Sequence, residues 1–224
     1  GGTGMAEALG VQFLDKAGQP IGPGGGALER LNRIDISGLD SRLQNVSVTV
    51  ACDVDNPLLG PHGATRTFAP QKGADPAMVE LLERAMARYA DILKRDVGID
   101  VVHIPGAGAA GGLGAALVAF CQATLRPGFS IVSEAVGLAD KLASADLVIT
   151  GEGRIDGQTA RGKVAAGVGK LARRYGVPVI AVAGSVADDA HELVPHILAG
   201  LYPIVPGPVT LETAMERAAD YLEA

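Results

Sequence analysis

The sequence predicts an α/β protein with largely parallel sheets and helices on both sides of them. After about residue 45, short segments rich in β-branched and apolar residues alternate with segments of helical character, as in buried parallel strands joined by helices. Of the 224 residues, 48% are hydrophobic and 20% are charged, so the chain can bury enough apolar surface to fold. The 31 glycines indicate tight turns and close backbone contacts.

The predicted elements follow one another along the chain. Residues 46–51 form the first strand, and the clearest helix begins at Asp75 as N-cap with Pro76 in its first turn. A domain boundary is predicted near Arg126, where an uncharged helix gives way to a Pro-Gly turn. Further strands are predicted at residues 99–104, 130–132, 147–150, 178–183 and 197–205, and further helices at residues 113–123, 134–142, 162–174 and after Thr210.

Charge and hydropathy exclude two classes of partner. With 19 Lys and Arg against 25 Asp and Glu, the net charge is −6, whereas nucleic-acid binding needs a basic surface. The uncharged stretch 101–125 contains Pro105 and several glycines, which leave too short a helix to cross a membrane. Cys52 and Cys121 have no C-x-x-C spacing, so we expect reduced thiols in a cytoplasmic protein.

The first candidate site follows the strand at residues 46–51. Asp53 and Asp55 come one residue apart at the strand end, where open α/β sheets bind ligands. Such a pair can hold Mg²⁺ through one or two carboxylate oxygens. The alternative is an Asx turn that prepares the chain for Pro57.

A second candidate is the long loop at residues 60–73. It combines glycines with the hydroxyls of Thr65 and Thr67 and with two cations, Arg66 and Lys72. Flexible amides, hydroxyls and cations suit a phosphate or a carboxylate. Its length exceeds that of an ordinary connection, which favours a functional role.

The third candidate is the glycine-rich segment 105–114. Gly106, Gly108 and Gly111 match the pattern G-x-G-x-x-G, in which backbone amides face a phosphate, and Gly112 extends the run. No acidic residue ends a second strand about twenty residues further on, so the match to a dinucleotide site is weak. Two readings stay open, a dinucleotide-binding oxidoreductase domain and glycines that only permit close packing.

The fourth candidate is the segment 150–163, which we expect to be a loop. Residues 157–163 match half of a P-loop, but Val164 stands where Mg²⁺ would need Ser or Thr. The segment brings two acids and two cations together, and a surface salt-bridge cluster is the alternative reading. Ser185 follows the next strand and adds a hydroxyl at the same edge. The charged residues are Glu152, Arg154, Asp156 and Lys163.

Three of these segments resemble one known family. Residues 51–74 (ACDVDNPLLGPHGATRTFAPQKGA), 105–117 (PGAGAAGGLGAAL) and 149–163 (ITGEGRIDGQTARGK) are similar to the signature segments of the bacterial glycerate kinase family, type I. The resemblance implies two Rossmann-like α/β domains, at residues 1–126 and 127–224, and a chain that lacks the family's N-terminal third. It also implies phosphorylation of D-glycerate to 2- or 3-phosphoglycerate with ATP and Mg²⁺.

The resemblance also points to site residues, to which we assign roles. Phosphoryl transfer needs charge neutralisation, in-line positioning and a metal. The expected partners are ATP and D-glycerate; a homo-oligomer and a non-catalytic fragment of a kinase both stay open. The catalytic candidates are Lys72, Arg66, Asp156 as base and Arg154; the nucleotide-binding candidates are Gly106, Gly108, Gly111, Gly112, Lys163 and Ser185; the metal candidates are Asp53, Asp55 and Glu152.

Overall fold

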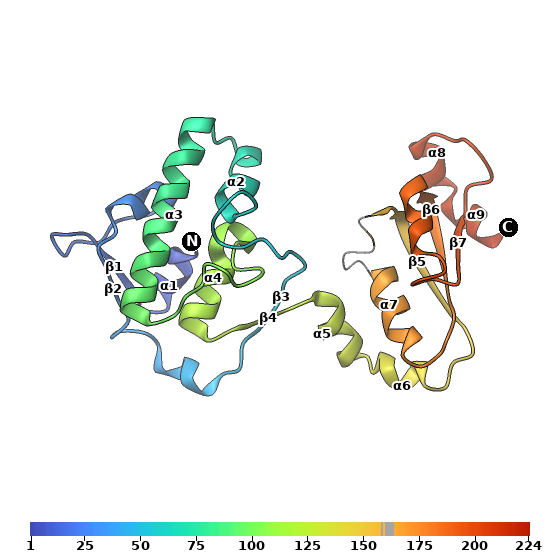
Figure 1. The fold of residues 1–224 in the computed structure, drawn as a ribbon, viewed down its shortest axis with the longest axis horizontal. Helices are drawn as coiled ribbons and strands as arrows, with labels where there is room; N and C mark the ends of the chain where they lie inside the picture. Colours follow the sequence, from blue (N-terminus) through green and yellow to red (C-terminus); the bar gives the residue numbers. More distant parts are fainter. Residues whose placement is uncertain (158, 160–163) are drawn as a thin grey trace. The chain divides into compact units, whose positions relative to one another are not determined.

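The computed structural model describes residues 1–157, 159 and 164–224. The chain divides into two compact units, Gly1–Arg126 and Pro127–Ala224, which are described separately. Figure 1 shows the helices and strands of each unit. No helix in the described part of the chain is long and apolar enough to span a membrane.

The long helix α3, Pro76–Val97, organises the first unit. The Asp75 carboxylate accepts a hydrogen bond from the Met78 amide at 2.8 Å, and Pro76 occupies the first turn, which confirms the predicted start. Gly98, with a φ of 81°, ends the helix in the left-handed conformation that glycine adopts without strain. The apolar face of α3 is buried, so this helix forms one wall of the core.

Elements that precede α3 in the chain pack against it. They include a pair of antiparallel strands, β1 (Gln12–Leu14) and β2 (Arg33–Asp35), which the sequence pattern did not predict. Phe13 on β1 lies between the rings of Tyr89 and Phe120, with ring centroids 6.2 and 5.9 Å away. The other early elements are the helix α1 (Thr3–Ala8) and the 3-10 helices η1 (Gly25–Arg30) and η2 (Ser41–Asn45).

A parallel pair of strands completes the first unit. β3 (Thr49–Ala51) pairs with β4 (Thr124–Arg126), and the helix α4 (Ala109–Cys121) precedes β4. The predicted strand at residues 99–104 is wrong, because this segment is irregular at residues 99–101 and turns at residues 102–104. The Asp100 carboxylate accepts a hydrogen bond from the Val102 amide at 3.2 Å, which favours a turn over an extended strand.

The second unit contains a fully parallel sheet with the strand order β5-β6-β7. The helix α7 (Val164–Arg173) packs on β5 and β6, and no methyl group fits at Gly169, where a Cβ would lie 2.6 Å from the Ile197 carbonyl oxygen. The parallel sheet confirms the predicted α/β class. Its strands are β5 (Val148–Ile155), β6 (Val179–Val186) and β7 (Gly200–Pro203).

The helices of the second unit differ in part from the prediction. Residues 130–132, predicted as a strand, lie within the helix α5 (Gly128–Ala135). A short apolar run fits either structure, and the ring of Phe129 packs tightly on Gly167 of α7, so packing selects the helix. Thr210 caps the next helix through its hydroxyl, 3.2 Å from the Thr213 amide. Other helices in the described part of this unit are α6 (Leu138–Leu142), η5 (Asp188–Leu193), α8 (Leu211–Glu216) and α9 (Ala218–Glu223).

Candidate functional site

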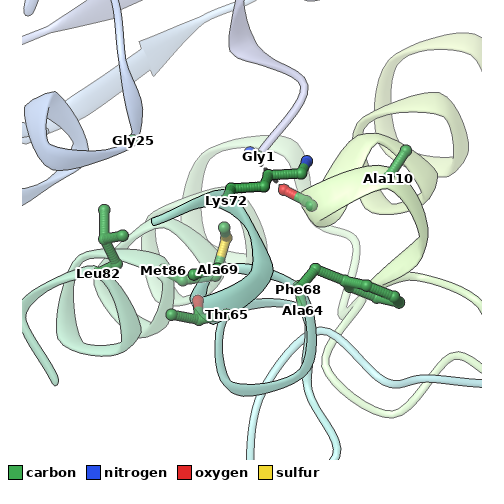
Figure 2. Close-up of a pocket in the computed structure, with 11 residues that line it drawn as sticks. Gly1, Gly25, Ala64, Thr65, Phe68, Ala69, Lys72, Leu82, Met86 and Ala110 are labelled. Carbon is green, nitrogen blue, oxygen red and sulfur yellow. Dashed lines mark hydrogen bonds between the residues drawn. The ribbon is translucent and has the colours of Figure 1, made fainter. Parts of the chain in front are cut away.

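The first unit contains a cavity of about 320 Å³ that Lys72 lines, and we call it the Lys72 cavity. Figure 2 shows Lys72 and Thr65 together with apolar and glycine residues around it. Within the described part of the chain, the Lys72 ammonium forms no ion pair with a carboxylate. The lining residues are Gly1, Gly25, Ala64, Thr65, Phe68, Ala69, Lys72, Leu82, Met86, Ala110 and Gly111.

The segment predicted as a long loop is mostly helical. It contains α2 (Ala64–Phe68) and the 3-10 helix η3 (Pro70–Lys72). Its start is fixed by two side chains, because the Gly60 amide donates to Glu83 Oε1 at 2.8 Å and Asn56 Nδ2 donates to the His62 carbonyl at 2.7 Å. Thr65 and Lys72 are therefore presented by short, anchored helices and not by a flexible loop.

Arg66 lies on the same helix as Thr65 but is held by a carboxylate. Its guanidinium forms two hydrogen bonds with Glu80 of α3, at 2.6 and 3.0 Å. The hydrogen bond from Arg66 and the nearby positive charge hold the pKa of the Glu80 carboxyl below its usual range. Arg66 is not among the residues that line the Lys72 cavity. The two cations predicted to act together are therefore in different environments.

The glycines at 106 and 108 bring two loops into contact. The Gly108 amide donates to the Asn56 carbonyl at 2.9 Å, and a Cβ at Gly108 would lie only 2.2 Å from the Pro57 carbonyl oxygen. At Gly106, which has a φ of 83°, a Cβ would lie 2.8 Å from the sulfur of Cys52. The segment after β3 and the glycine-rich segment are thus neighbours, and Gly108 is required there for close packing.

The backbone turns left-handed directly after Gly108. Ala110, Gly111 and Gly112 have φ values of 50°, 70° and 93°, so regular helix begins only after them. No strand precedes the segment among the described residues 99–105. The strand and the helix N-terminus that a dinucleotide loop needs are both missing from this described segment, so the geometry does not support the dinucleotide reading.

The carboxylates proposed for magnesium are divided between the two units. Asp53 and Asp55 are exposed and lie in the segment that contacts the glycine-rich loop, whereas Glu152 lies in the second unit. Within the described part of the chain, no group of three or more His, Cys, Asp or Glu side chains is arranged to hold a metal. Asp53 and Asp55 remain two oxygen ligands one residue apart, and their role stays a prediction.

In the second unit, the predicted loop at residues 150–163 is partly strand. β5 continues to Ile155, so Glu152 and Arg154 are strand residues, and β6 continues far enough to include Ser185. The parallel register places Glu152 opposite Ala183 and Arg154 opposite Ser185. The strands extend further than predicted because glycines there permit close pairing: a Cβ at Gly184 would lie 2.7 Å from the Gly153 carbonyl oxygen.

The polar groups at the end of β5 are held by separate contacts. Glu152 Oε1 accepts a hydrogen bond from the Ala165 amide in the first turn of α7, at 3.3 Å. Arg154 Nε lies 3.8 Å from Asp156 Oδ2, and the Thr159 amide donates to the Asp156 carbonyl at 2.9 Å. Lys163, the predicted cation of this segment, lies outside the described residues.

Comparison with known proteins identifies the family. The family model described as the glycerate kinase family matches residues 1–224. The chain belongs to the glycerate kinase family. It is 53% identical over 223 residues to the glycerate kinase of Bacillus subtilis (strain 168), covering 100% of this chain and 58% of that protein. It is 48% identical over 220 residues to the glycerate 2-kinase of Escherichia coli (strain K12), covering 98% of this chain and 58% of that protein.

A solved structure supports the same conclusion for the fold. The structure from Salmonella typhimurium LT2 of a protein assigned as glycerate kinase 2 matches with a TM-score of 0.81 and 50% identity, over 99% of this chain and 57% of that one. The chain therefore spans rather more than half the length of the glycerate kinases that it matches. The α/β fold with parallel sheets flanked by helices is therefore that of the matched glycerate kinase structure over the part that this chain covers.

Sequence reasoning missed two features of the Lys72 cavity. The sequence marks Thr65 only as one of two hydroxyls in a predicted loop, and it gives no indication of Ala110. The sequence feature that could have indicated Thr65 is its position seven residues before Lys72, in a segment that forms two consecutive short helices. A left-handed conformation at an alanine has no signal in a single sequence, because alanine ordinarily avoids it.

The contact at Gly108 predicts a large effect from one methyl group. The φ of Gly108 is −76°, which alanine adopts without strain, so the cost of Gly108→Ala comes from the steric clash alone. We expect this variant to lower the free energy of unfolding by about 1–3 kcal/mol. Gly4→Ala is the matched control: Gly4 lies in α1 with nothing within 4 Å, so alanine should stabilise by about 0.5–1 kcal/mol. Urea unfolding followed by circular dichroism measures both, and equal effects would refute the steric argument.

The Arg66–Glu80 pair predicts a measurable pKa change. Removing the donor with Arg66→Gln should raise the pKa of the Glu80 carboxyl, which carbon NMR titration of glutamate carboxyls can follow. The pKa of Glu80 is lowered in the folded chain, so the pair stabilises the folded state fully at pH values above the ordinary glutamate pKa. This stabilisation is lost as the pH falls through the pKa that Glu80 has in the folded state.

Arg95→Gln provides the control for this titration. The main partner of Arg95 is the Asp96 carboxylate, 2.6 Å from Nε, so this variant should raise the pKa of Asp96 and leave that of Glu80 unchanged. If the Glu80 titration is the same in wild type and Arg66→Gln, the pair does not form in solution.

Proposed function

We propose that the full-length protein containing this chain is an ATP-dependent glycerate kinase. In this reaction a hydroxyl oxygen of D-glycerate forms a bond to the γ-phosphorus of ATP, the bond from that phosphorus to the ADP oxygen breaks, and the hydroxyl proton passes to a base. The products are ADP and 2- or 3-phosphoglycerate. The observation that carries the proposal is the match of the glycerate kinase family over residues 1–224, and a cavity lysine with no carboxylate partner among the described residues supports it.

Residues of both units contribute to the proposal. Lys72 is suited to bind an anionic group because no carboxylate neutralises it among the described residues. Asp156 remains the proposed base. Ser185 and Arg154 are neighbours across β5 and β6, where a hydroxyl and a cation suit a phosphate. The amide of Gly108 is occupied by the Asn56 carbonyl, so phosphate binding would fall to other amides of that segment.

The donor chemistry of the chain fits magnesium. Mg²⁺ is held by one or two carboxylates together with waters and substrate phosphates, and Asp53 and Asp55 supply two exposed carboxylates at the end of β3. Glu152 is the alternative ligand, although one of its oxygens accepts the Ala165 amide. When bound, the ion would neutralise phosphate charge during transfer. We also propose a cytoplasmic location, which the free thiols of Cys52 and Cys121 support.

The isolated 224-residue chain is expected to be inactive. It spans 58% of the glycerate kinase of Bacillus subtilis (strain 168), so a substantial part of that protein has no counterpart in it. Assaying ATP consumption of the isolated chain with D-glycerate tests this expectation, and measurable turnover would show that the 224 residues suffice for catalysis.

The kinase proposal predicts a strict dependence on two ligands. We expect the full-length protein to consume ATP only when D-glycerate and Mg²⁺ are both present. Lys72→Ala should lower turnover at least tenfold, equivalent to about 1.4 kcal/mol of barrier. Lys94→Ala is the matched control, because Lys94 lies on α3 and is paired with Asp100 at 2.7 Å. Activity of Lys72→Ala within twofold of wild type would remove Lys72 from the site.

The position of phosphorylation is decided by product analysis. The relative from Escherichia coli (strain K12) that is 48% identical carries the name glycerate 2-kinase, which supports phosphorylation of the 2-hydroxyl. Phosphorus NMR of the reaction mixture distinguishes the two products by the proton coupling of the phosphate ester. A CH–O–P signal indicates 2-phosphoglycerate, and a CH₂–O–P signal contradicts it.

A further inference from the structure

We propose that the Lys72 cavity binds the carboxylate end of the hydroxy-acid substrate, and that Thr65 is a specificity-determining residue that hydrogen-bonds the acid beside Lys72. This inference rests on the proposed function and deepens it, because it assigns one substrate to one cavity and adds a residue to the site. Thr65 and Lys72 reach the cavity from α2 and η3 (Figure 2).

The charge of the cavity lining is positive, and besides Lys72 the lining includes the Gly1 amino group, whose pKa is lowered to about 6 by burial and by the nearby Lys72. Lys72 is the only charged side chain among its eleven lining residues, none of which is acidic. A carboxylate carries one negative charge and is balanced by one ammonium group. A nucleotide triphosphate carries several charges and needs several cations or a metal, and the cavity lining offers no carboxylate that could ligate one.

Thr65 offers a free hydroxyl to the cavity. Its residue is 5% exposed, and its hydroxyl forms no hydrogen bond with any residue that the structure describes. The buried side-chain oxygens without a partner among the described residues are those of Glu83 and Tyr89, so the Thr65 oxygen is not sealed off and a ligand in the cavity can reach it. A ligand oxygen would accept a hydrogen bond from Thr65 in the same cavity that the Lys72 side chain lines.

The remaining walls fit a small carbon skeleton. Phe68, Leu82 and Met86 contribute apolar side chains, and small-molecule cavities generally combine such walls with a few polar groups that fix orientation. At about 320 Å³ the cavity lies at the lower end of the range of about 300–1,000 Å³ for ligand sites. A small organic acid suits this volume better than a nucleotide does.

The backbone of the cavity is held in an unusual conformation. Ala110 lines the cavity with a φ of 50°, and a left-handed conformation costs an alanine about 1–2 kcal/mol. The next residue, Gly111, is fixed by a hydrogen bond of 2.8 Å from the Gly1 nitrogen to its carbonyl. Strain of this kind persists where the surrounding structure enforces it, and it is concentrated at ligand sites.

The Arg66–Glu80 pair orients the helix that carries Thr65. Two hydrogen bonds from Arg66 to Glu80 join α2, which carries Thr65, to α3, which contributes Leu82 and Met86 to the cavity. Arg66 therefore acts as a positioning residue in this proposal, and Lys72 is the cation that contacts the acid.

Steady-state kinetics of the full-length protein tests the proposal. Thr65→Val removes the hydroxyl at nearly constant volume and should raise KM for D-glycerate at least fivefold while KM for ATP stays within twofold. Thr65→Ser keeps the hydroxyl and should retain a KM for D-glycerate within twofold of wild type. Thr124→Val is the matched control, because Thr124 is exposed on β4 and does not line the cavity, and we expect it to leave KM for D-glycerate unchanged. Thermal unfolding of each variant reports whether it is folded.

A binding experiment separates a carboxylate from a phosphate. Isothermal titration with D-glycerate in the absence of ATP should show saturable binding to wild type and at least tenfold weaker binding to Lys72→Met. Inorganic phosphate should not compete with D-glycerate for this site. Competition by phosphate, together with a raised KM for ATP in Thr65→Val, would assign the cavity to the nucleotide and overturn the proposal.

The outcomes distinguish this inference from the proposed function. If wild type shows no D-glycerate-dependent consumption of ATP, the proposed function fails. If wild type is active and folded Thr65→Val keeps a KM for D-glycerate within twofold, the kinase stands and the assignment of Thr65 fails. If Thr65→Val does not fold, the titration of folded Lys72→Met with D-glycerate decides whether the cavity binds the acid.

Discussion

The first unit depends on a backbone contact that leaves no room for a side chain. Gly108 lies so close to Pro57 that a methyl group would meet the carbonyl oxygen, and its amide is bonded to Asn56. This contact joins the segment after β3 to the start of α4. The left-handed residues Ala110 and Gly111 follow directly, so the same contact fixes the wall of the Lys72 cavity. The glycine-rich run matches the sequence pattern of a phosphate loop, but in this structure its glycines allow the segment after β3 and the start of α4 to pack closely.

Arg66 and Lys72 differ in their expected roles because the fold places different side chains beside them. Arg66 and Lys72 are six residues apart and carry the same charge, yet among the described residues Arg66 is paired with a carboxylate, Glu80 on α3, and Lys72 is not. A guanidinium forms two parallel hydrogen bonds with a carboxylate, which suits a structural pair. Lys72 instead lines a cavity together with Thr65 and apolar residues, where its ammonium is suited to a ligand.

The second unit uses glycine to extend its strands. Gly153 and Gly184 let β5 and β6 approach closely, so the pairing continues as far as Ile155 and Val186. Glu152 and Arg154 are consequently held on a strand, and Glu152 also caps the first turn of α7. Charged residues on a paired strand are more precisely positioned than residues in a loop, which suits binding and transfer chemistry.

The sequence by itself determined the α/β class, the N-cap at Asp75, the parallel pairing after residue 45 and the family, because these depend on local spacing and on long recognisable segments. Tertiary structure alone decided that residues 99–104 turn, that residues 130–132 are helical and that the β1–β2 pair forms. It also decided that Lys72, Thr65 and Ala110 share a cavity while Arg66 binds Glu80. A short apolar run or an isolated charge has no fixed local preference, so the partners that the fold brings beside it determine its conformation and its contacts.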